Sequence, residues 1–505
     1  MKNKIYTLVL GLAFSLATTS CEDFLDVNNN PNQPISENLP LSAKLPAALV
    51  SSVNQETVQL NQLGALWGGY WGTANEGISL FTKEKAYNGP ALRHQRDGLP
   101  IWENGYVNLL YYQLIKEEAL AEQAYYYAGV AKIMQGWHFL RLVDVYNNIP
   151  FDDALQGTKH PTPRYEDGKT VYAKSINLIT DGIADIKRAT PVSVAGKDDL
   201  VFGGDKTKWV KFANTIKLRA LLRQSEANNQ AFIIAELQKI ATEGSGFLGT
   251  GENALVQPGY LNTAGKLNPL WETYYRNVQG VNTTNHLNLR PTEFAIAQYQ
   301  QRNDPRLGNL YTQVNGNYKG VLFGNPSNQN TAYNRANTSV FKGPAENGTK
   351  PAAVFKSATQ ASVLMGSFES LFLQAEAAQR GWITGSAKTF YELAIQESFK
   401  YMEVPAGEFA AYNNQNSVNF DQATDKIERI IEQKWLALNS ISSIEAWNDY
   451  RRLGFPNLPN SLLAPSPTAR PLRLMYPETE RQTNDAEASK QGNDDILTAR
   501  VWWDQ

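Results

Sequence analysis

The sequence is almost without cysteine. Cys21 is the only one among 505 residues, so no internal disulfide can form. Charged residues are also scarce, at 19%, and the formal net charge is -2. No basic stripe of the kind that neutralises phosphates is present, which argues against nucleic-acid binding. The polar surface must therefore come largely from amides and hydroxyls, and amides are dense in loops such as residues 325–330 (NPSNQN).

The sequence also lacks the motifs of common catalytic and metal sites. It has no complete phosphate-binding loop of the form Gly-x-x-x-x-Gly-Lys-Ser/Thr and no Gly-x-Ser-x-Gly motif. Adjacent carboxylate pairs do occur, such as those at residues 152–153 and 198–199. Adjacent side chains point apart and do not face each other across about 5–9 Å, as glycoside hydrolysis requires, so we interpret them as solvated loop charges. The four histidines are scattered: His94, His138, His160 and His286. We therefore predict no catalytic residue, no metal site and no cofactor.

The first residues have the layout of a bacterial lipoprotein signal. Lys2 and Lys4 precede an almost wholly apolar run at residues 5–17, small residues follow at 18–20, and then comes Cys21. The run is too short to span a bilayer. A thiol at this place can accept a diacylglyceryl group, and several acyl chains anchor a protein durably. The alternative is an ordinary secretory signal followed by an unrelated cysteine.

This layout divides the chain. We expect a signal peptide at residues 1–20, lipidation at Cys21, and a tether at residues 21–35, where the turn-forming stretch NNNPNQP lies. No later segment approaches the length of a transmembrane helix. Residues 36–505 would then form a single folded body.

Apolar residues recur at helical spacing over two long parts of this body. Residues 104–241 and 366–453 are predicted to form a helical scaffold, so the fold class is mostly α. The first helical pattern, at residues 36–62, is interrupted by Pro40 and Pro46, and we expect it to break there. Between the two parts, residues 244–362 are rich in Gly, Pro, Asn and Tyr and lose the helical period. We expect long loops there, with a few short strands and helices.

One pair of segments has the spacing of a tetratricopeptide helix pair. Ala387, Tyr391 and Ala394 lie 12, 16 and 19 residues after Ala375. Small side chains at such positions let two antiparallel helices approach closely, and the tyrosine ring fills the groove between them. The spacing therefore predicts a helical-repeat unit here.

Two aromatic clusters combine rings with polar side chains, the mixture that captures an oligomer without chemistry. The first cluster lies in a glycine-rich segment, where sharp turns are expected to leave ring faces uncovered. Its candidate ligand-binding residues are Trp67, Tyr70, Trp71 and Asn75, with Glu76 beside them. The second cluster lies in the loop-rich middle and comprises Trp271, Tyr274, Tyr275 and Arg276. The alternative for both clusters is that the rings fill gaps between the loops and the scaffold.

Several short motifs, in order along the chain, resemble the SusD/RagB family of outer-membrane lipoproteins, and within it the second SusD-like subfamily. They are CEDFLD (21–26), AKIMQGW (131–137), DVYNNIPF (144–151), ALQG (154–157), FANTIKLR (212–219), AEAAQRG (375–381), EQKW (432–435), EAWNDYRR (445–452) and YPETE (476–480). Asn147 and Asn148 depart from the family pattern at one loop. The acidic pair at residues 22–23 resembles the surface-export signal of Bacteroidetes lipoproteins.

The resemblance implies a scaffold of about four tetratricopeptide-like helix pairs with the ligand held by the loop-built region. It also implies a lipid-anchored protein at the cell surface that delivers oligosaccharides to a SusC-like TonB-dependent transporter of the outer membrane. An oligopeptide ligand is the alternative within the family. Outside it, the sequence leaves open a surface glycosidase and a helical-repeat scaffold that binds no small ligand.

Overall fold

The computed structural model describes residues 39–94, 96–325, 330–346 and 351–505. The predicted signal peptide, Cys21 and the tether lie outside these residues. The longer helices are α2 (Leu41–Asn54), α6 (Ile101–Ala121), α7 (Tyr125–Tyr146), α8 (Gly168–Arg188), α9 (Lys206–Arg223), α10 (Gln230–Glu243), α15 (Ser367–Gln379), α16 (Ala387–Tyr401), α18 (Lys426–Leu438) and α19 (Ser443–Leu453). The protein is therefore mostly α-helical, as predicted.

Shorter elements connect these helices. The short α-helices are α3 (Asn61–Trp67), α4 (Thr82–Lys85), α5 (Gly89–Leu92), α11 (Pro269–Tyr274), α12 (Thr284–Asn288), α13 (Glu293–Gln300), α14 (Leu307–Leu310), α17 (Glu408–Asn413), α20 (Glu478–Thr483) and α21 (Asp485–Ala488). Single helical turns are η3 (Asn75–Gly77), η4 (Gly157–Lys159), η5 (Pro191–Ser193), η6 (Thr331–Tyr333), η7 (Arg335–Asn337) and η8 (Ser489–Gln491).

The strands are short and pair two by two in antiparallel fashion: β1 (Trp71–Thr73) with β5 (Leu289–Pro291), β2 (Ile149–Pro150) with β3 (Tyr165–Glu166), and β4 (Ala254–Val256) with β6 (Ser362–Met365). Two of these pairs involve the loop-rich middle: β1 pairs with β5, and β4 pairs with β6. The first pair holds the glycine-rich segment of the first aromatic cluster against residues more than 200 positions away.

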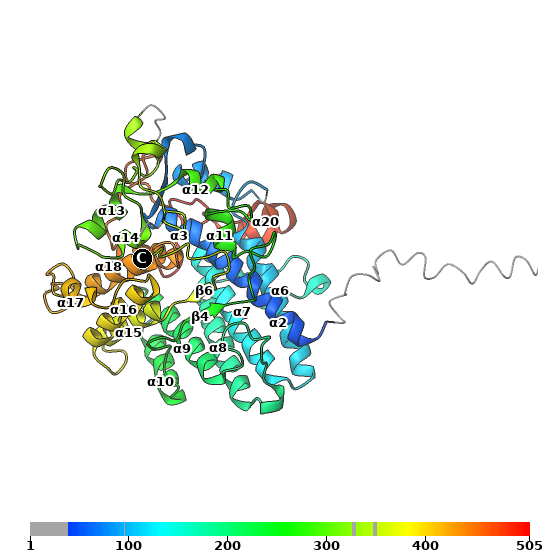
Figure 1. Ribbon diagram of the computed structural model, residues 1–505. Coiled ribbons are helices and arrows are strands. Elements are labelled where there is room, and N and C mark those ends of the chain that lie inside the picture. The colour runs from blue at the N-terminus through cyan, green and yellow to red at the C-terminus, as the bar shows by residue number, and fades with distance from the viewer. Residues whose placement is uncertain (1–38, 95, 326–329, 347–350) are drawn as a thin grey trace, which may run out of the picture.

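The long helices pack in an array. Helix α7 lies between α6 and α8, α8 packs on α9, α9 packs on α15, and α15 packs on both α16 and α18. Figure 1 shows α6 to α10 together in one part of the molecule, whereas α11 to α14 lie in another part, beside α3. None of the helices formed by the described residues combines the length and the apolar composition needed to cross a bilayer.

Local sequence explains where these helices begin and which face they bury. In α8 the side chain of Asp167 accepts a hydrogen bond from the Thr170 amide and so caps the first turn. Ile176, Ile179 and Ile183 then follow at helical spacing and are buried. The pair predicted from tetratricopeptide spacing is also present, since α15 and α16 pack together and bury Tyr391 between them.

The break expected at Pro46 is wrong. Pro46 lies inside α2, which continues without interruption through the π-helical turn η2 (Gln55–Leu60) and α3 to Trp67. A proline inside a helix removes one backbone hydrogen bond. Leu45 and Leu49 are fully buried beside it, and this packing keeps the helix intact.

The interpretation of the carboxylate pairs as solvated loop charges is also wrong for one member of each. Asp199 is 3% exposed and accepts hydrogen bonds from the Tyr126 hydroxyl and the Trp209 indole, at 2.8 and 2.9 Å. Asp153 is buried and accepts from Arg164 Nε at 2.6 Å. Asp199 therefore fixes its loop to α7 and α9, whereas Asp153 joins two parts of the connection between β2 and β3.

The helices are tied together at their centre by buried charges. Glu445 of α19 is fully buried and forms ion pairs with Arg141 of α7 and with Arg219 and Arg223 of α9. Arg219 also pairs with Glu369 of α15, at 3.2 Å. This network joins elements that lie up to 300 residues apart in the sequence.

A close crossing of α3 and α19 requires the glycine at position 64. A Cβ atom there would lie 2.1 Å from the backbone nitrogen of Ile444. A backbone atom cannot move aside without displacing the helix that contains it. Gly64→Ala is expected to lower the unfolding free energy by about 2 kcal/mol because it forces the two helices apart. Denaturant unfolding measures this change.

Gly407 offers a matched control, because no heavy atom lies within 4 Å of a Cβ built there. Gly407→Ala should leave stability nearly unchanged. Equal stabilities of the two variants would contradict the close crossing.

Candidate ligand-binding site

The rings of the first predicted cluster are buried. Tyr70 stacks on Trp435 with ring centroids 4.4 Å apart and donates its hydroxyl proton to the Trp435 carbonyl at 2.6 Å. Trp71 donates from its indole nitrogen to Ser440 Oγ at 2.8 Å. Trp67 packs edge-on against Trp447 at 5.0 Å. These rings bind the glycine-rich segment to α18 and α19.

The expectation of uncovered ring faces is therefore wrong for this cluster. A Cβ at Gly72 would lie 2.5 Å from the side chain of Val321. The missing side chain lets this neighbouring segment pack directly on the backbone beside Trp71. The rings themselves pack against Trp435, Trp447 and Tyr274. Burial also raises the pKa of Tyr70 well above its usual value, so its hydroxyl stays protonated.

The structure brings the second cluster onto the first. Tyr274 packs edge-on against Trp71 with centroids 4.9 Å apart, and Tyr275 stacks on Phe355 at 5.3 Å. Tyr274 and Tyr275 are almost fully buried and Trp271 is 8% exposed. The two clusters thus form one aromatic layer beneath the loops, and ligand contact by these rings stays a prediction.

The polar members of the first cluster hold a loop. Asn75 accepts a hydrogen bond from Asn325 Nδ2 at 2.5 Å and donates to the Asn330 carbonyl. The neighbouring carboxylate of Glu76 accepts from the Arg335 amide at 2.9 Å. These contacts bridge at least 250 residues of sequence and position the loop that contains η6 and η7.

The polar members of the second cluster hold a carboxylate. Tyr275 donates to Glu346 at 2.6 Å and Arg276 donates to it at 3.0 Å. Burial alone would raise the pKa of Glu346, but hydrogen bonds from His286, Tyr275 and Arg276 lower it to about 2. Arg276 is half-buried and engaged in this ion pair.

An open hollow of about 610 Å³ lies between α13 and the loop that Asn75 and Glu76 position. It lies in the part of the molecule that contains α11 to α14 (Figure 1). Its lining combines two tyrosines with amides and few charges: Glu293, Ile296, Gln300, Tyr318, Lys319, Gly320, Asn330, Thr331, Ala332, Tyr333 and Asn337. Tyr318 and Tyr333 are half-buried, so part of each ring faces the opening.

This lining can hold a neutral, hydroxyl-rich ligand. Burial and the nearby Glu293 raise the pKa of Tyr333, and burial raises that of Tyr318, so both hydroxyls are neutral and can donate or accept. Ring faces stack on apolar C–H faces, and amides take the polar edges. The hollow therefore has the composition that the two predicted clusters were expected to supply.

Sequence reasoning missed Tyr318, Tyr333 and the amides around them. One signal was present, since Asn330, which closes the amide-rich stretch at residues 325–330, lines the hollow. Nothing local linked that stretch to α13, because the connection passes through Asn75 and Glu76. Among the residues that the structure describes, no group of three or more His, Cys, Asp or Glu is placed to hold a metal ion.

Comparison with known proteins identifies the fold. A SusD homologue from Bacteroides fragilis superimposes with a TM-score of 0.72 at 23% identity, covering 92% of this chain and 99% of that one. A chitin-binding SusD homologue from Flavobacterium johnsoniae gives 0.72 at 22%, covering 91% and 98%. A SusD homologue from Bacteroides thetaiotaomicron gives 0.72 at 22%, covering 92% and 99%. No curated protein matches the chain.

A protein-family match covers most of the sequence. Residues 38–477 match the second SusD-like family, which is described as starch-binding and associating with the outer membrane. This match and the shared helical fold confirm the resemblance seen in the motifs. The chain belongs to the SusD/RagB family.

Proposed function

We propose that the protein is a nutrient-binding lipoprotein that captures oligosaccharides in the hollow beside α13 and delivers them to a TonB-dependent outer-membrane transporter. The observation that carries this proposal is the lining of the hollow, where two half-buried tyrosines lie among amides. The family description and the chitin-binding relative support a glycan as ligand.

The same lining favours binding without chemistry. Among the described residues that line the hollow, Glu293 is the one carboxylate, whereas glycoside hydrolysis uses a facing pair about 5–9.5 Å apart. A glycosidase alternative would need a second acid here. The proposal therefore assigns no catalytic residue.

We further propose that residues 1–20 are the signal peptide, that Cys21 is lipidated, and that residues 21–35 tether the body to the membrane. The body begins near α2. Lys44 in the first turn of α2 forms an ion pair with Glu118 near the end of α6, so the tether would emerge beside α6.

An exposed apolar stripe lies on that helix and suits the transporter as its partner. Val107, Leu110, Tyr111 and Leu114 follow at intervals of three and four residues and are each 40–43% exposed. Such spacing places them on one face of α6. Exposed apolar patches of this kind mark interaction surfaces, and this one lies where the anchored end would meet the membrane.

The double variant Leu110→Glu/Leu114→Glu is expected to reduce the amount of transporter that co-purifies from membranes about tenfold, because two charges would be buried in the contact. Leu261→Glu is the matched control, since Leu261 is 52% exposed but lies in the loop-rich middle. Unchanged recovery with the α6 variant would place the contact elsewhere.

Isothermal titration of the full chain in detergent tests the proposed ligand class. Chito- and malto-oligosaccharides are compared with peptides of similar length. Saturable binding of an oligosaccharide without cleavage supports the proposal. Binding of peptides alone would show that the protein is an oligopeptide-binding member of the family. Cleavage of an oligosaccharide that a single Glu or Asp substitution abolishes would show that the protein is an enzyme.

A further inference from the structure

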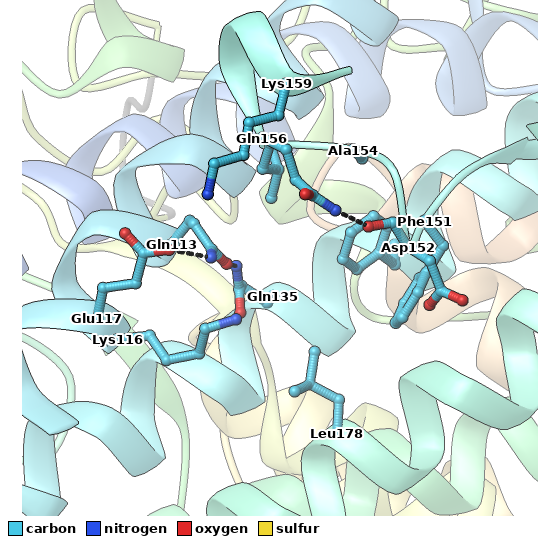
Figure 2. A pocket seen from close by; sticks show the side chains of 12 residues that line it. Gln113, Lys116, Glu117, Gln135, Phe151, Asp152, Ala154, Gln156, Lys159 and Leu178 are labelled. Atoms are coloured by element: carbon cyan, nitrogen blue, oxygen red, sulfur yellow. Dashed lines mark hydrogen bonds between the residues drawn. The ribbon is translucent and has the colours of Figure 1, made fainter. Parts of the chain in front are cut away.

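A second hollow, of about 500 Å³, lies on the helical scaffold. Helix α6 contributes Gln113, Lys116 and Glu117, which share one face at intervals of three and four residues. Helix α7 contributes Gln135 and Phe139, four residues apart. The loop after β2 forms the facing wall, and Figure 2 shows Lys159 extending from it toward Gln113. This volume suits a small organic ligand.

The two ammonium groups of this hollow are without counter-ions. Neither Lys116 nor Lys159 has a carboxylate within ion-pair distance among the described residues. The acids nearby are already engaged: Glu117 accepts a hydrogen bond from Gln113 Nε2 at 2.6 Å, and Asp152 pairs with Lys174 at 2.5 Å. The hollow therefore presents two ammonium groups that form no ion pair within the described part of the chain, while the carboxylate of Glu117 beside them acts on Lys116 electrostatically.

A buried amide adds a hydrogen-bond acceptor. Gln135 is 1% exposed and donates from Nε2 to Gln113 Oε1 at 3.0 Å. Its Oε1 atom has no hydrogen-bond partner among the described residues. A buried acceptor without a donor costs stability, so a ligand hydroxyl in the hollow would satisfy it.

The remaining wall is apolar. Phe139 and Phe151 pack with ring centroids 4.3 Å apart, and Leu178 of α8 lies on the same wall. A ligand held here needs a carboxylate for the lysines, a hydroxyl for Gln135 and an apolar face for the rings. We propose that the hollow between α6, α7 and the 151–159 loop is a second binding site, which takes a sugar acid such as a uronic acid residue.

Two observations separate this site from the proposed oligosaccharide site. Helix α13, which lines the first hollow, lies in a different part of the molecule from α6, α7 and α8 (Figure 1). The first hollow is lined mainly by tyrosines and amides with one lysine, Lys319, whereas the second brings two lysines, Lys116 and Lys159, to one space. Burial also lowers the pKa of Lys116, and a bound carboxylate would raise it again.

The test is a titration of the full chain in detergent with sodium glucuronate, glucose and the dipeptide Ala-Asp. Glucuronate should bind, and glucose should bind at least about tenfold more weakly because it lacks the charge. Lys116→Gln and Lys159→Gln should each weaken glucuronate binding about tenfold. Lys197→Gln, which removes an exposed lysine elsewhere, should leave it unchanged.

Three results would overturn the proposal. Equal binding of glucose and glucuronate would show that charge plays no part in recognition. Unchanged glucuronate binding by both lysine variants would show that glucuronate binds outside this hollow. Binding of Ala-Asp as tight as that of glucuronate would remove the sugar assignment. Lys159 is an exposed loop residue, so Lys159→Gln keeps the test valid if Lys116→Gln disturbs folding. Truncating Tyr318 and Tyr333 should not affect glucuronate binding, which separates this site from the first.

Discussion

Glu445→Gln is expected to lower the free energy of unfolding by about 3–5 kcal/mol, the cost typical of breaking a buried ion pair from one side. Glu445 is fully buried and pairs with Arg141, Arg219 and Arg223. The glutamine has the same shape but no charge, so the three guanidinium groups would face one another without their shared counter-ion.

Denaturant unfolding followed by far-ultraviolet circular dichroism measures this loss. Asp421→Asn is the matched control, because Asp421 is 56% exposed at the side chain and forms a surface pair with Lys388. Surface pairs typically contribute less than about 1 kcal/mol. A Glu445 variant no less stable than this control would show that the network does not hold the helices together.

The effect of Glu445→Gln should also depend on pH. Burial raises the pKa of Glu445, but the neighbouring arginines outweigh it and hold the pKa well below its ordinary 4.5. A carboxyl whose folded pKa is depressed contributes stability above its unfolded pKa and loses that contribution as pH falls. The difference between wild type and variant should therefore shrink as pH falls from 7 toward 3, and a constant difference would contradict the depressed pKa.

The helical scaffold could be predicted because its signal is local. In α8 the capping residue and the apolar stripe all lie within one segment, so periodicity finds them. The Glu445 network has no such signal, since its arginines lie more than 200 residues away in the sequence. Pro46 is the opposite case. The local rule that proline interrupts a helix predicted a break, but tertiary packing around Pro46 keeps α2 continuous.

The candidate site shows the same limit. The glycine-rich segment drew attention to Trp67, Tyr70 and Trp71, and the loop-rich middle was expected to hold the ligand. Local sequence could not show that Val321 packs on the backbone at Gly72, or that the rings are buried against α18 and α19. Nor could it show that Asn75 and Glu76 position a loop at least 250 residues away. The ring-and-amide surface therefore lies in the expected region but is made by Tyr318 and Tyr333.

Tyr318→Ala/Tyr333→Ala is expected to weaken oligosaccharide binding about 100-fold, because aromatic anchors in a partly enclosed site each contribute on the order of 1–2 kcal/mol. Each ring presents a partly exposed face to the hollow, and its loss removes both stacking area and a hydroxyl. Single variants should each weaken binding about tenfold. Isothermal titration with the best oligosaccharide of the initial screen measures the change.

Tyr111→Ala is the matched control, since Tyr111 is 42% exposed on α6, away from the hollow. Its binding should equal that of wild type. The double variant should also keep its unfolding midpoint, because neither ring is fully buried. If the double variant bound as tightly as Tyr111→Ala, the hollow beside α13 would not be the ligand site. Loss of binding with unchanged stability would instead assign recognition to these two rings.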